Sequence, residues 1–416
     1  MSFFQLSLIA AVALLGPLLA LPRKWHIPVV LGQLLAGIAI GRTGLGLVDS
    51  SDPTFTFVAD VGFALIMFVA GTHVPVRDKA IRPALGGGAL RAGIAAVLAA
   101  VVGVVIAFAF GTGHAPLYIV LLASSSAALV LPIVDSLRLT GPKVLTTTAQ
   151  VAVADIACIV ALPLAVDPPN APRAAVGAAV VAACAAVLFF VLRWLENSGN
   201  RGRLHDVSED RKFALELRIQ LALLFALSGL AVLGHVSIML AGFSFGLVVS
   251  AVGEPRRLAH QLFAVSDGFL GPVFFVWLGA SLDLRTLAGS PQMILLGICL
   301  GLGTLLVHGS LRVLGQPLPL AVLAASQLGV PVAAATIGSQ LHLLEPGEAA
   351  AMILGALISI GASTIAGSRA ARTFSEASSE AAGEGPAGKG PAGKGPAGKP
   401  SEGGPATAAG SPEPAA

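Results

Sequence analysis

The chain has 416 residues, of which 55% are hydrophobic and only 11% are charged, and its mean hydropathy is +0.86. A soluble domain carries about 25% charged residues, so this composition argues against soluble enzymes and nucleic-acid-binding proteins. The apolar residues fall in discrete blocks, which predicts an all-α polytopic membrane protein rather than a barrel of short alternating strands.

Thirteen apolar blocks predict transmembrane helices, because a helix needs about 20 apolar residues to cross the hydrocarbon core. In chain order these spans are 3–21, 27–45, 54–72, 89–110, 115–137, 144–166, 174–195, 213–233, 236–253, 263–282, 292–314, 317–341 and 347–367. The first block is not expected to be a signal peptide, because its basic residues Arg23 and Lys24 follow the apolar run.

The basic residues predict the orientation of the chain. Most of them lie in loops that follow odd-numbered spans, whereas the loops after even-numbered spans hold only Arg42, Arg173 and Arg285. The positive-inside rule then places the N-terminus outside the cytoplasmic membrane and the C-terminus in the cytoplasm.

The end of the chain differs in composition from the rest. Residues 373–416 repeat the motif GPAGK and are rich in Gly, Pro and Ala, which cannot bury a core. We therefore expect a transmembrane domain at 1–372 and a disordered cytoplasmic tail at 373–416. The alternative is that the tail is an arm that binds anionic lipid or a partner.

Two pairs of motifs predict an internal repeat. LGQLLAGIAIG around Gly37 resembles LAGFSFGLVVS around Gly246, and FVAGTHVPVRD around Gly71 resembles VWLGASLDLRT around Gly279. The offsets, of 209 and 208 residues, agree and relate spans 1–6 to spans 8–13 in opposite orientation. Inverted repeats are typical of secondary transporters that work by alternating access.

The fifth span of each repeat combines polar residues with a proline. Ion-pathway candidates in these spans are Ser124, Ser125, Ser126 and Pro132 in 115–137 and Ser326, Gln327 and Pro331 in 317–341. Because proline removes a backbone donor and disturbs the helix, the freed carbonyls could face a cation. In transporters with inverted repeats such broken helices cross near the membrane midplane, so we expect these two spans to cross there. An ordinary proline kink is the alternative.

Asp155 is the acidic residue that falls at the centre of a predicted span, 144–166. An unpaired carboxylate at this depth costs about 3 kcal/mol, so we expect it to face a cavity or a partner. Removal from bulk water favours the protonated form of a carboxyl group, so Asp155 could hold either a proton or a cation. Competition between the two would give antiport, with Asp155 as a ligand of transported Na⁺ or K⁺. The alternative is a structural, hydrogen-bonded aspartate.

Other polar residues inside the spans are weaker candidates. Thr148 and Gln150, on the same span as Asp155, are candidates for lining the ion pathway. His308 is the histidine inside a predicted span and is a candidate pH sensor or partner of Asp155. The alternative is a histidine that packs on a carbonyl group.

Together these motifs resemble the monovalent cation/proton antiporter family, of the sodium/hydrogen exchanger type, in the branch of the potassium-efflux transporters. PVVLGQLLAGIAIG is similar to its second span, and SSAALVLPIV is similar to an SSTA-V-V-L-P element, with Ala127 in place of Thr. VADIACIVALPL is similar to the span of the essential aspartate, which falls on Asp155, and AGFSFGLVVS and FFVWLGASLDL are similar to later segments. The resemblance implies a homodimer in which a core domain (spans 4–6 and 11–13) moves against a dimerising panel (spans 1–3 and 8–10).

The chain departs from the family pattern at charged positions. Ala154 replaces a polar or acidic residue, the segment LGVPVAA of span 12 lacks a glutamate, and His308 is the nearest counterpart of a lysine of span 11. These changes predict electroneutral exchange. The alternatives are a transporter of an organic solute or anion on the same scaffold, or a transport-inactive membrane sensor.

An enzyme, a cofactor or a resident metal is not expected. The three cysteines, Cys158, Cys184 and Cys299, lie inside apolar blocks, which argues against disulfides and metal ligation. A nucleophile and base at membrane depth are also missing from the sequence pattern. The expected substrates are a monovalent cation and H⁺, and the expected surroundings are membrane lipid.

Overall fold

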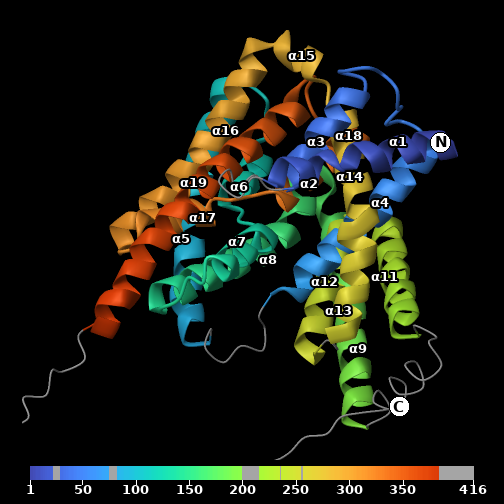
Figure 1. Cartoon of the computed structure of the whole chain (residues 1–416). Coiled ribbons are helices and arrows are strands. Elements are labelled where there is room, and N and C mark those ends of the chain that lie inside the picture. The colour runs from blue at the N-terminus through green and yellow to red at the C-terminus, as the bar shows by residue number, and fades with distance from the viewer. Residues whose placement is uncertain (22–28, 75–81, 199–214, 235, 254–255, 384–416) are drawn as a thin grey trace, which may run out of the picture. The chain divides into compact units, whose positions relative to one another are not determined.

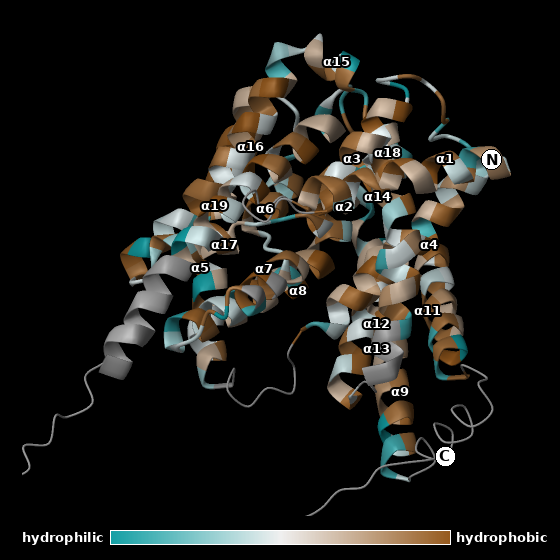
Figure 2. Cartoon of the chain, viewed as in Figure 1, coloured by the Kyte–Doolittle hydropathy of each residue, from teal (hydrophilic) through white to brown (hydrophobic). Residues whose placement is uncertain are grey.

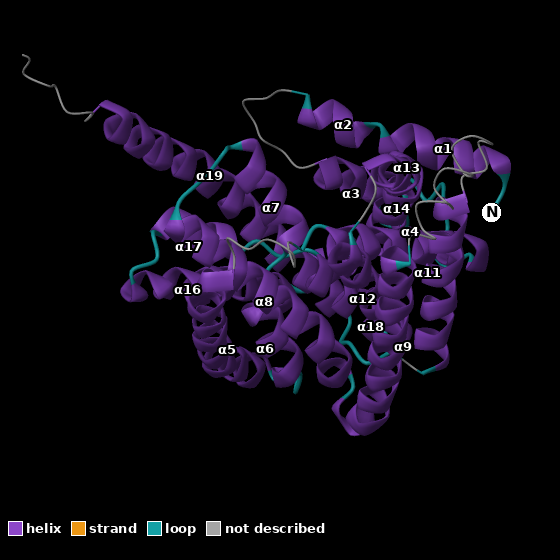
Figure 3. Ribbon diagram, turned by 90° about the horizontal axis from the view of Figure 1, so that it is seen from below, coloured by secondary structure: helices purple, strands orange, loops and turns teal. Residues whose placement is uncertain are grey.

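Helices form the described part of the chain, and no strand occurs among these residues (Figure 3). The structure, a computed structural model, describes residues 1–21, 29–74, 82–198, 215–234, 236–253 and 256–383. The chain divides into two units, Met1–Ser375 and Glu376–Ala416, and the first contains every helix discussed below except the end of the last one. The all-helical fold predicted from the sequence is therefore confirmed.

The helices of the first half follow one another with short connections. They are α1 (Phe3–Ala13), α2 (Leu15–Ala20), α3 (Val29–Ile40), α4 (Pro53–Thr72), α5 (Arg82–Phe110), α6 (Ala115–Ala123), α7 (Ala127–Ser136), α8 (Pro142–Val166) and α9 (Ala171–Asn197). The start of α4 is an example of a capped helix end. Asp52 accepts hydrogen bonds from the N–H groups of Thr54 and Phe55, and Pro53 occupies the first turn.

The second half repeats this pattern of long helices and interrupted ones. Its helices are α11 (Leu215–Leu233), α12 (Ile238–Val252), α13 (Arg256–Val265), α14 (Gly271–Ser281), α15 (Leu284–Ala288), α16 (Pro291–Ser310), α17 (Leu318–Ala324), α18 (Gly329–Gln340) and α19 (Glu348–Gly383). A π-helical turn, Ser266–Leu270, joins α13 to α14. Helix α19 continues past residue 372, and residues 384–416 of the expected tail lie outside the described residues.

The described helices include ten segments that are long and apolar enough to cross a membrane. Three further apolar helices, Val29–Ile40, Ala115–Leu131 and Ile238–Val252, are shorter. Each of the thirteen predicted spans overlaps one of these segments, but the count of thirteen stays a prediction because three of the helices are short of the usual length.

Apolar side chains on the outer faces of the helices are consistent with a lipid environment. On α5, Val97, Val101, Val105 and Phe108 are all at least 60% exposed and share one helix face. Figure 2 shows the same prevalence of hydrophobic residues along most helices, with hydrophilic residues concentrated near helix ends and loops. Such a surface would be unfavourable in water, so the chain is a multi-pass membrane protein.

One group of helices, here called the panel, consists of α1–α4 and α11–α14. Helix α4 packs against α12 and α14, and α3 packs against α14 (Figure 1). These contacts are close because glycines face one another: a Cβ atom built on Gly37 would lie 2.9 Å from the Cα atom of Gly279, and one built on Gly71 would lie 2.9 Å from that of Gly246. A side chain at any of these positions would therefore separate the helices.

The two glycine contacts relate the predicted repeats to each other. Gly37 corresponds to Gly246 in the sequence repeat, and Gly71 corresponds to Gly279, yet Gly37 contacts Gly279 and Gly71 contacts Gly246. Each glycine thus contacts the repeat partner of the other glycine in its own half. This exchange of partners is what a two-fold relation between the halves requires. It supports the inverted repeat, whose further details stay a prediction.

The other group, here called the core, consists of α5–α8 and α16–α19. Helix α5 packs against α6, α8 and α16, while α17 and α18 pack against α8 (Figure 1). Helix α9 contacts α8 of the core and also α11 and α12 of the panel. The two groups contain the spans that the family resemblance assigns to a core and a panel, and the movement of one group against the other stays a prediction.

Two membrane helices of the core are interrupted. Residues 124–126 separate α6 from α7, and residues 325–328 separate α17 from α18. The expected break at each proline lies elsewhere, because Pro331 is the third residue of α18 and Pro132 lies within α7. The breaks therefore fall on the polar clusters that precede the prolines.

Candidate functional site

The two interrupted segments meet, and hydrogen bonds hold them together. The N–H group of Ser126 donates to the carbonyl oxygen of Ser326 at 2.8 Å. The hydroxyl group of Ser125 donates to the carbonyl oxygen of Ala324 at 2.6 Å. Residues that are about 200 positions apart in the sequence thus form one buried crossing.

Asp155 reaches this crossing from the middle of α8. Its side chain is 6% exposed, and its Oδ2 atom accepts a hydrogen bond of 2.9 Å from the N–H group of Ala127, the first residue of α7. Ser126 occupies the N-cap position of α7 but makes no capping bond with its side chain. Asp155 therefore caps α7 from a neighbouring helix, where the free N–H groups and the helix dipole favour a negative charge.

A chain of polar side chains lies next to the crossing. The Ser124 hydroxyl donates to Gln327 Oε1 at 2.6 Å, and Gln327 Nε2 donates to Thr304 Oγ1 at 2.9 Å. All three side chains are at most 3% exposed. Thr304, on α16, was not expected from the sequence, because nothing in its apolar surroundings distinguishes it from a threonine that bonds only to its own helix.

Thr148 and Gln150 are buried on α8, as expected for residues inside the core. Gln150 does not point into the crossing: its Oε1 atom accepts a hydrogen bond of 3.0 Å from Gln316, which also donates to Thr147. This contact joins α8 to the residues that precede α17. The role of Thr148, Gln150 and Pro132 in an ion pathway stays a prediction, and the side chain of Pro132 lies outside the described part of the structure.

His308 lies on α16, one turn after Thr304, and its side chain is fully buried. The imidazole ring faces the backbone of Leu122 and Ser124 at the end of α6. Neither ring nitrogen has a hydrogen bond of good geometry among the described residues. His308 thus packs on the interrupted helix rather than on Asp155, and its role as a pH sensor stays a prediction.

A second buried carboxylate, Glu348, lies at the edge of the last predicted span, 347–367, and the sequence pattern assigns it no role. In the structure it begins α19, is fully buried, and accepts hydrogen bonds from Tyr118 at 2.6 Å and from His114 at 2.8 Å. Tyr118 is the only tyrosine of the chain and lies in an apolar block, so its need for a buried partner was the available signal. This cluster ties α6 to α19 at the end of the core away from the crossing.

A cavity of about 480 Å³ opens between the panel and the core. Its lining includes Asp60 and Phe63 of α4, Pro163 of α8, and Thr336 and Gln340 of α18. Thr336 also lines a neighbouring cavity of about 540 Å³, together with Trp277 and Asp283. Asp155 is not among the lining residues of either cavity.

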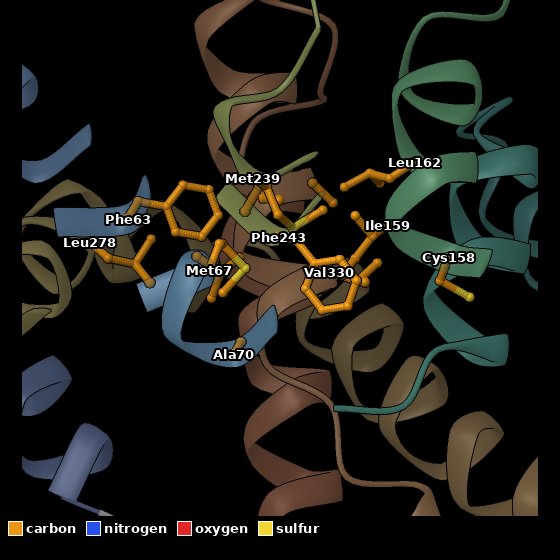
Figure 4. Packing of buried hydrophobic residues seen from close by; sticks show 14 of the residues in the cluster. Phe63, Met67, Ala70, Cys158, Ile159, Leu162, Met239, Phe243, Leu278 and Val330 are labelled. Atoms are coloured by element: carbon orange, nitrogen blue, oxygen red, sulfur yellow. The ribbon is translucent and has the colours of Figure 1, made fainter. Parts of the chain in front are cut away.

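Apolar side chains fill the space between the panel and the core next to Asp155. Figure 4 shows Phe63, Met67, Met239 and Phe243 of the panel opposite residues of the core, which are Ile159 and Leu162 of α8 and Val330 of α18. These side chains belong to one buried cluster. Ile159 and Leu162, one and two turns after Asp155 on α8, therefore face apolar side chains of the panel.

Comparison with known proteins places this architecture in a family. The family model "Sodium/hydrogen exchanger, transmembrane" matches residues 10–369. A putative Na⁺/H⁺ antiporter of Bacillus subtilis, YjbQ, is 27% identical over 86% of this chain and 61% of that protein. A probable Na⁺/H⁺ antiporter of Methanocaldococcus jannaschii is 22% identical over 77% of this chain and 85% of that protein.

The potassium-efflux branch is also represented among the relatives. The glutathione-regulated potassium-efflux system protein KefC of Cronobacter sakazakii is 29% identical over 64% of this chain and 43% of that protein. The chain thus spans less than two thirds of the length of YjbQ and of KefC.

The structure is similar to that of the sodium proton antiporter MjNhaP1 from Methanocaldococcus jannaschii, with a TM-score of 0.60. That match has 18% sequence identity and covers 88% of this chain and 97% of that chain, so it shows a shared fold. The family predicted from the motifs is confirmed by the match over most of the chain. The chain therefore belongs to the transmembrane sodium/hydrogen exchanger family.

Proposed function

We propose that this protein exchanges a monovalent cation, Na⁺ or K⁺, for protons across the cytoplasmic membrane by alternating access around Asp155. The observation that carries the proposal is the buried carboxylate of Asp155 at the N-terminus of α7, where two interrupted helices cross. The names of the relatives, which include Na⁺/H⁺ antiporters and a potassium-efflux protein, support the choice of these cations.

The chemistry of the crossing suits a hard cation. The carboxylate of Asp155, the hydroxyl groups of Ser124 and Ser125, and carbonyl groups of the interrupted segments are all oxygen ligands. A proton and a cation compete for the same carboxylate, so binding of one releases the other. If the empty, charged site does not cross the membrane, this competition couples the two fluxes in opposite directions.

The neutral partners at the crossing support electroneutral exchange. Ala154 precedes Asp155, and the side chains that bridge to α16 and α18 are the amide of Gln327 and the hydroxyl group of Thr304. With one titrating carboxylate, one proton leaves for each monovalent cation that binds. We further propose that the protein lies in the cell membrane with its N-terminus outside and that it acts as a homodimer.

An organic solute or anion transporter on the same scaffold is the second candidate. An anion site would place Arg or Lys side chains beside the interrupted helices, whereas the side chains that meet at this crossing among the described residues are Ser, Gln, Thr and Asp. The crossing therefore favours a cation over an anion.

The deciding experiment measures cation-induced pH change in proteoliposomes that contain the full chain. Wild-type protein should collapse a pH gradient when Na⁺ or K⁺ is added, with Li⁺ and Rb⁺ as comparisons, and the rate should not depend on a clamped membrane potential. Asp155→Asn should abolish the exchange, whereas Asp135→Asn, at an exposed position at the end of α7, should retain it. Normal exchange by Asp155→Asn would contradict the proposal.

A further inference from the structure

The cavity of about 480 Å³ contains a carboxylate that the exchange site does not use. Asp60 lies in the second turn of α4, is half-buried, and makes no hydrogen bond or ion pair with other described residues. Of the other charged residues that line the cavity, Asp167 accepts a hydrogen bond from Asn170 and Arg173 is exposed at the rim. The two carboxylates and one guanidinium group of the lining give it a net charge of −1, and Asp60 is the carboxylate without a hydrogen bond among the described residues.

Thr336 supplies a second oxygen atom to the same cavity. Its side chain is 8% exposed, and its Oγ1 atom has no hydrogen-bonding partner among the described residues. Buried hydroxyl groups without a protein partner are uncommon in folded proteins, and a bound ion or water is one usual partner for them. Gln340, one turn later on α18, adds an amide oxygen to the lining.

The cavity lies at a distance from Asp155. Pro163, which lines the cavity, follows Asp155 by eight residues on α8, which corresponds to about 12 Å along a helix. The apolar cluster that includes Phe63, Ile159 and Leu162 fills the space next to α8 between these two positions (Figure 4). A cation held in the cavity is therefore at a separate site from the exchange carboxylate.

We propose that Asp60 and Thr336 form a vestibule site that binds a partly hydrated monovalent cation before it passes to, or after it leaves, Asp155. Oxygen ligands of this kind, with one negative charge and room for water, suit a cation that keeps part of its hydration shell. The inference rests on the proposed exchange function. It adds a site that belongs to one face of the membrane, because the cavity lining includes Val166 and Asp167 at the end of α8.

Asp267 provides a matched control at the opposite end of the panel. It lies in the π-helical turn before α14, close enough to His73 at the end of α4 for an electrostatic interaction. His73 follows Asp60 by 13 residues, which corresponds to about 20 Å along a helix. Asp267→Asn thus removes one negative charge from the panel, as Asp60→Asn does, but at the end of the panel opposite the cavity.

The first experiment measures exchange by the full chain in right-side-out and everted vesicles with Na⁺ and with K⁺. Asp60→Asn should raise the half-saturating cation concentration by about tenfold on the face of the cavity only, because a cleft with one sign of charge concentrates counter-ions to this degree. The maximal rate should stay near that of the wild type, and Asp267→Asn should leave the half-saturating concentration on this face unchanged. The vestibule site would be overturned if Asp60→Asn left the half-saturating cation concentration unchanged, or if Asp60→Asn and Asp267→Asn changed it equally.

The second experiment does not depend on exchange. Thr336→Cys, in a chain with Cys158, Cys184 and Cys299 replaced by Ser, is labelled with two methanethiosulfonates that carry a trimethylammonium or a sulfonate group. The labelling rate of each reagent is divided by its rate with a small free thiol in solution, which corrects for intrinsic reactivity. The corrected rate of the cationic reagent should be at least about tenfold higher than that of the anionic reagent, and Asp60→Asn should remove this difference. Equal corrected rates of the two reagents with the Thr336→Cys chain that keeps Asp60 would contradict a cation site. A clear preference in protein that exchanges no cation would reject the proposed function and keep the vestibule site.

Discussion

The carboxylate of Asp155 caps helix α7 by accepting a hydrogen bond of 2.9 Å from the N–H group of Ala127. One side chain therefore serves both as the proposed exchange site and as a structural cap. The two roles place different demands on the side chain, because a cap needs an acceptor oxygen whereas exchange needs a group that titrates.

Substitutions at residue 155 should separate these roles. Asp155→Asn keeps an oxygen that can accept the Ala127 N–H bond, so we expect a melting temperature in detergent close to that of the wild type together with loss of exchange. Asp155→Leu leaves the N–H group unpaired and should cost about 1–3 kcal/mol of unfolding free energy. Equal destabilisation by both variants would show that the negative charge itself, rather than the acceptor oxygen, stabilises α7.

Acid should weaken cation binding by competition. As the pH falls, protons occupy the carboxylate of Asp155 and the half-saturating cation concentration should rise, by up to about tenfold per pH unit. The maximal rate at saturating cation should change much less. Initial rates over a series of Na⁺ or K⁺ concentrations at several pH values test this expectation. If the maximal rate fell while the half-saturating cation concentration stayed constant, protons would act at a group other than Asp155.

The hydrogen bond from Gln327 to Thr304 should stabilise the crossing. Thr304→Val leaves the buried amide of Gln327 without its acceptor, and we expect a loss of about 1–3 kcal/mol of unfolding free energy. Thr364→Val is the matched control, because Thr304 and Thr364 both donate to the carbonyl oxygen four residues earlier in their own helices. Equal effects of the two substitutions in thermal unfolding would assign the loss to the helix rather than to the bond with Gln327.

The close contact of α4 with α12 should not tolerate a methyl group. A Cβ atom at Gly71 would collide with the carbonyl oxygen of Phe243, so Gly71→Ala should cost about 1–3 kcal/mol of unfolding free energy. Gly229→Ala, in α11, meets no atom within 4 Å and should be neutral or stabilising by up to about 1 kcal/mol. Thermal unfolding of both variants in the same detergent compares them. A neutral Gly71→Ala would mean that these helices can separate without loss.

The proposed orientation can be tested with single cysteines on the two faces. In a chain with the native cysteines replaced by Ser, Ser51→Cys lies in the exposed connection before α4 and Thr140→Cys in the exposed turn before α8. A membrane-impermeant maleimide should label Ser51→Cys in right-side-out vesicles and Thr140→Cys in everted vesicles, as the positive-inside rule requires. The reverse pattern would invert the orientation and leave the fold unchanged.

The sequence predicted those features that local composition determines. Apolar blocks locate the helices because each block must satisfy its backbone within itself, and the isolation of Asp155 in such a block makes it the candidate exchange site. The polar clusters around Ser125 and Ser326 marked the crossing for the same reason. The prolines were less informative, because the breaks lie where the two segments exchange hydrogen bonds with each other.

Features that depend on distant partners could not be predicted in this way. Glu348 follows a Pro-Gly pair that is typical of a loop, and its burial results from Tyr118 and His114, more than 200 residues away. Thr304 is likewise set apart only by the amide of Gln327. A glutamate after a turn and a threonine in an apolar helix are both common, so the sequence alone does not single them out. Their hydrogen-bonding partners come from distant segments that tertiary packing brings close.

The hydrogen bond between Ser126 and Ser326 joins main-chain atoms, so only proline at position 126 would delete it directly, by removing the N–H group. The two halves of the polypeptide are thus joined by their backbones inside the core, in addition to the glycine contacts of the panel. A displacement of either interrupted helix would carry the other with it, and Asp155 would follow through its bond to Ala127. In such a displacement, the groups of the proposed exchange site would keep their positions relative to one another.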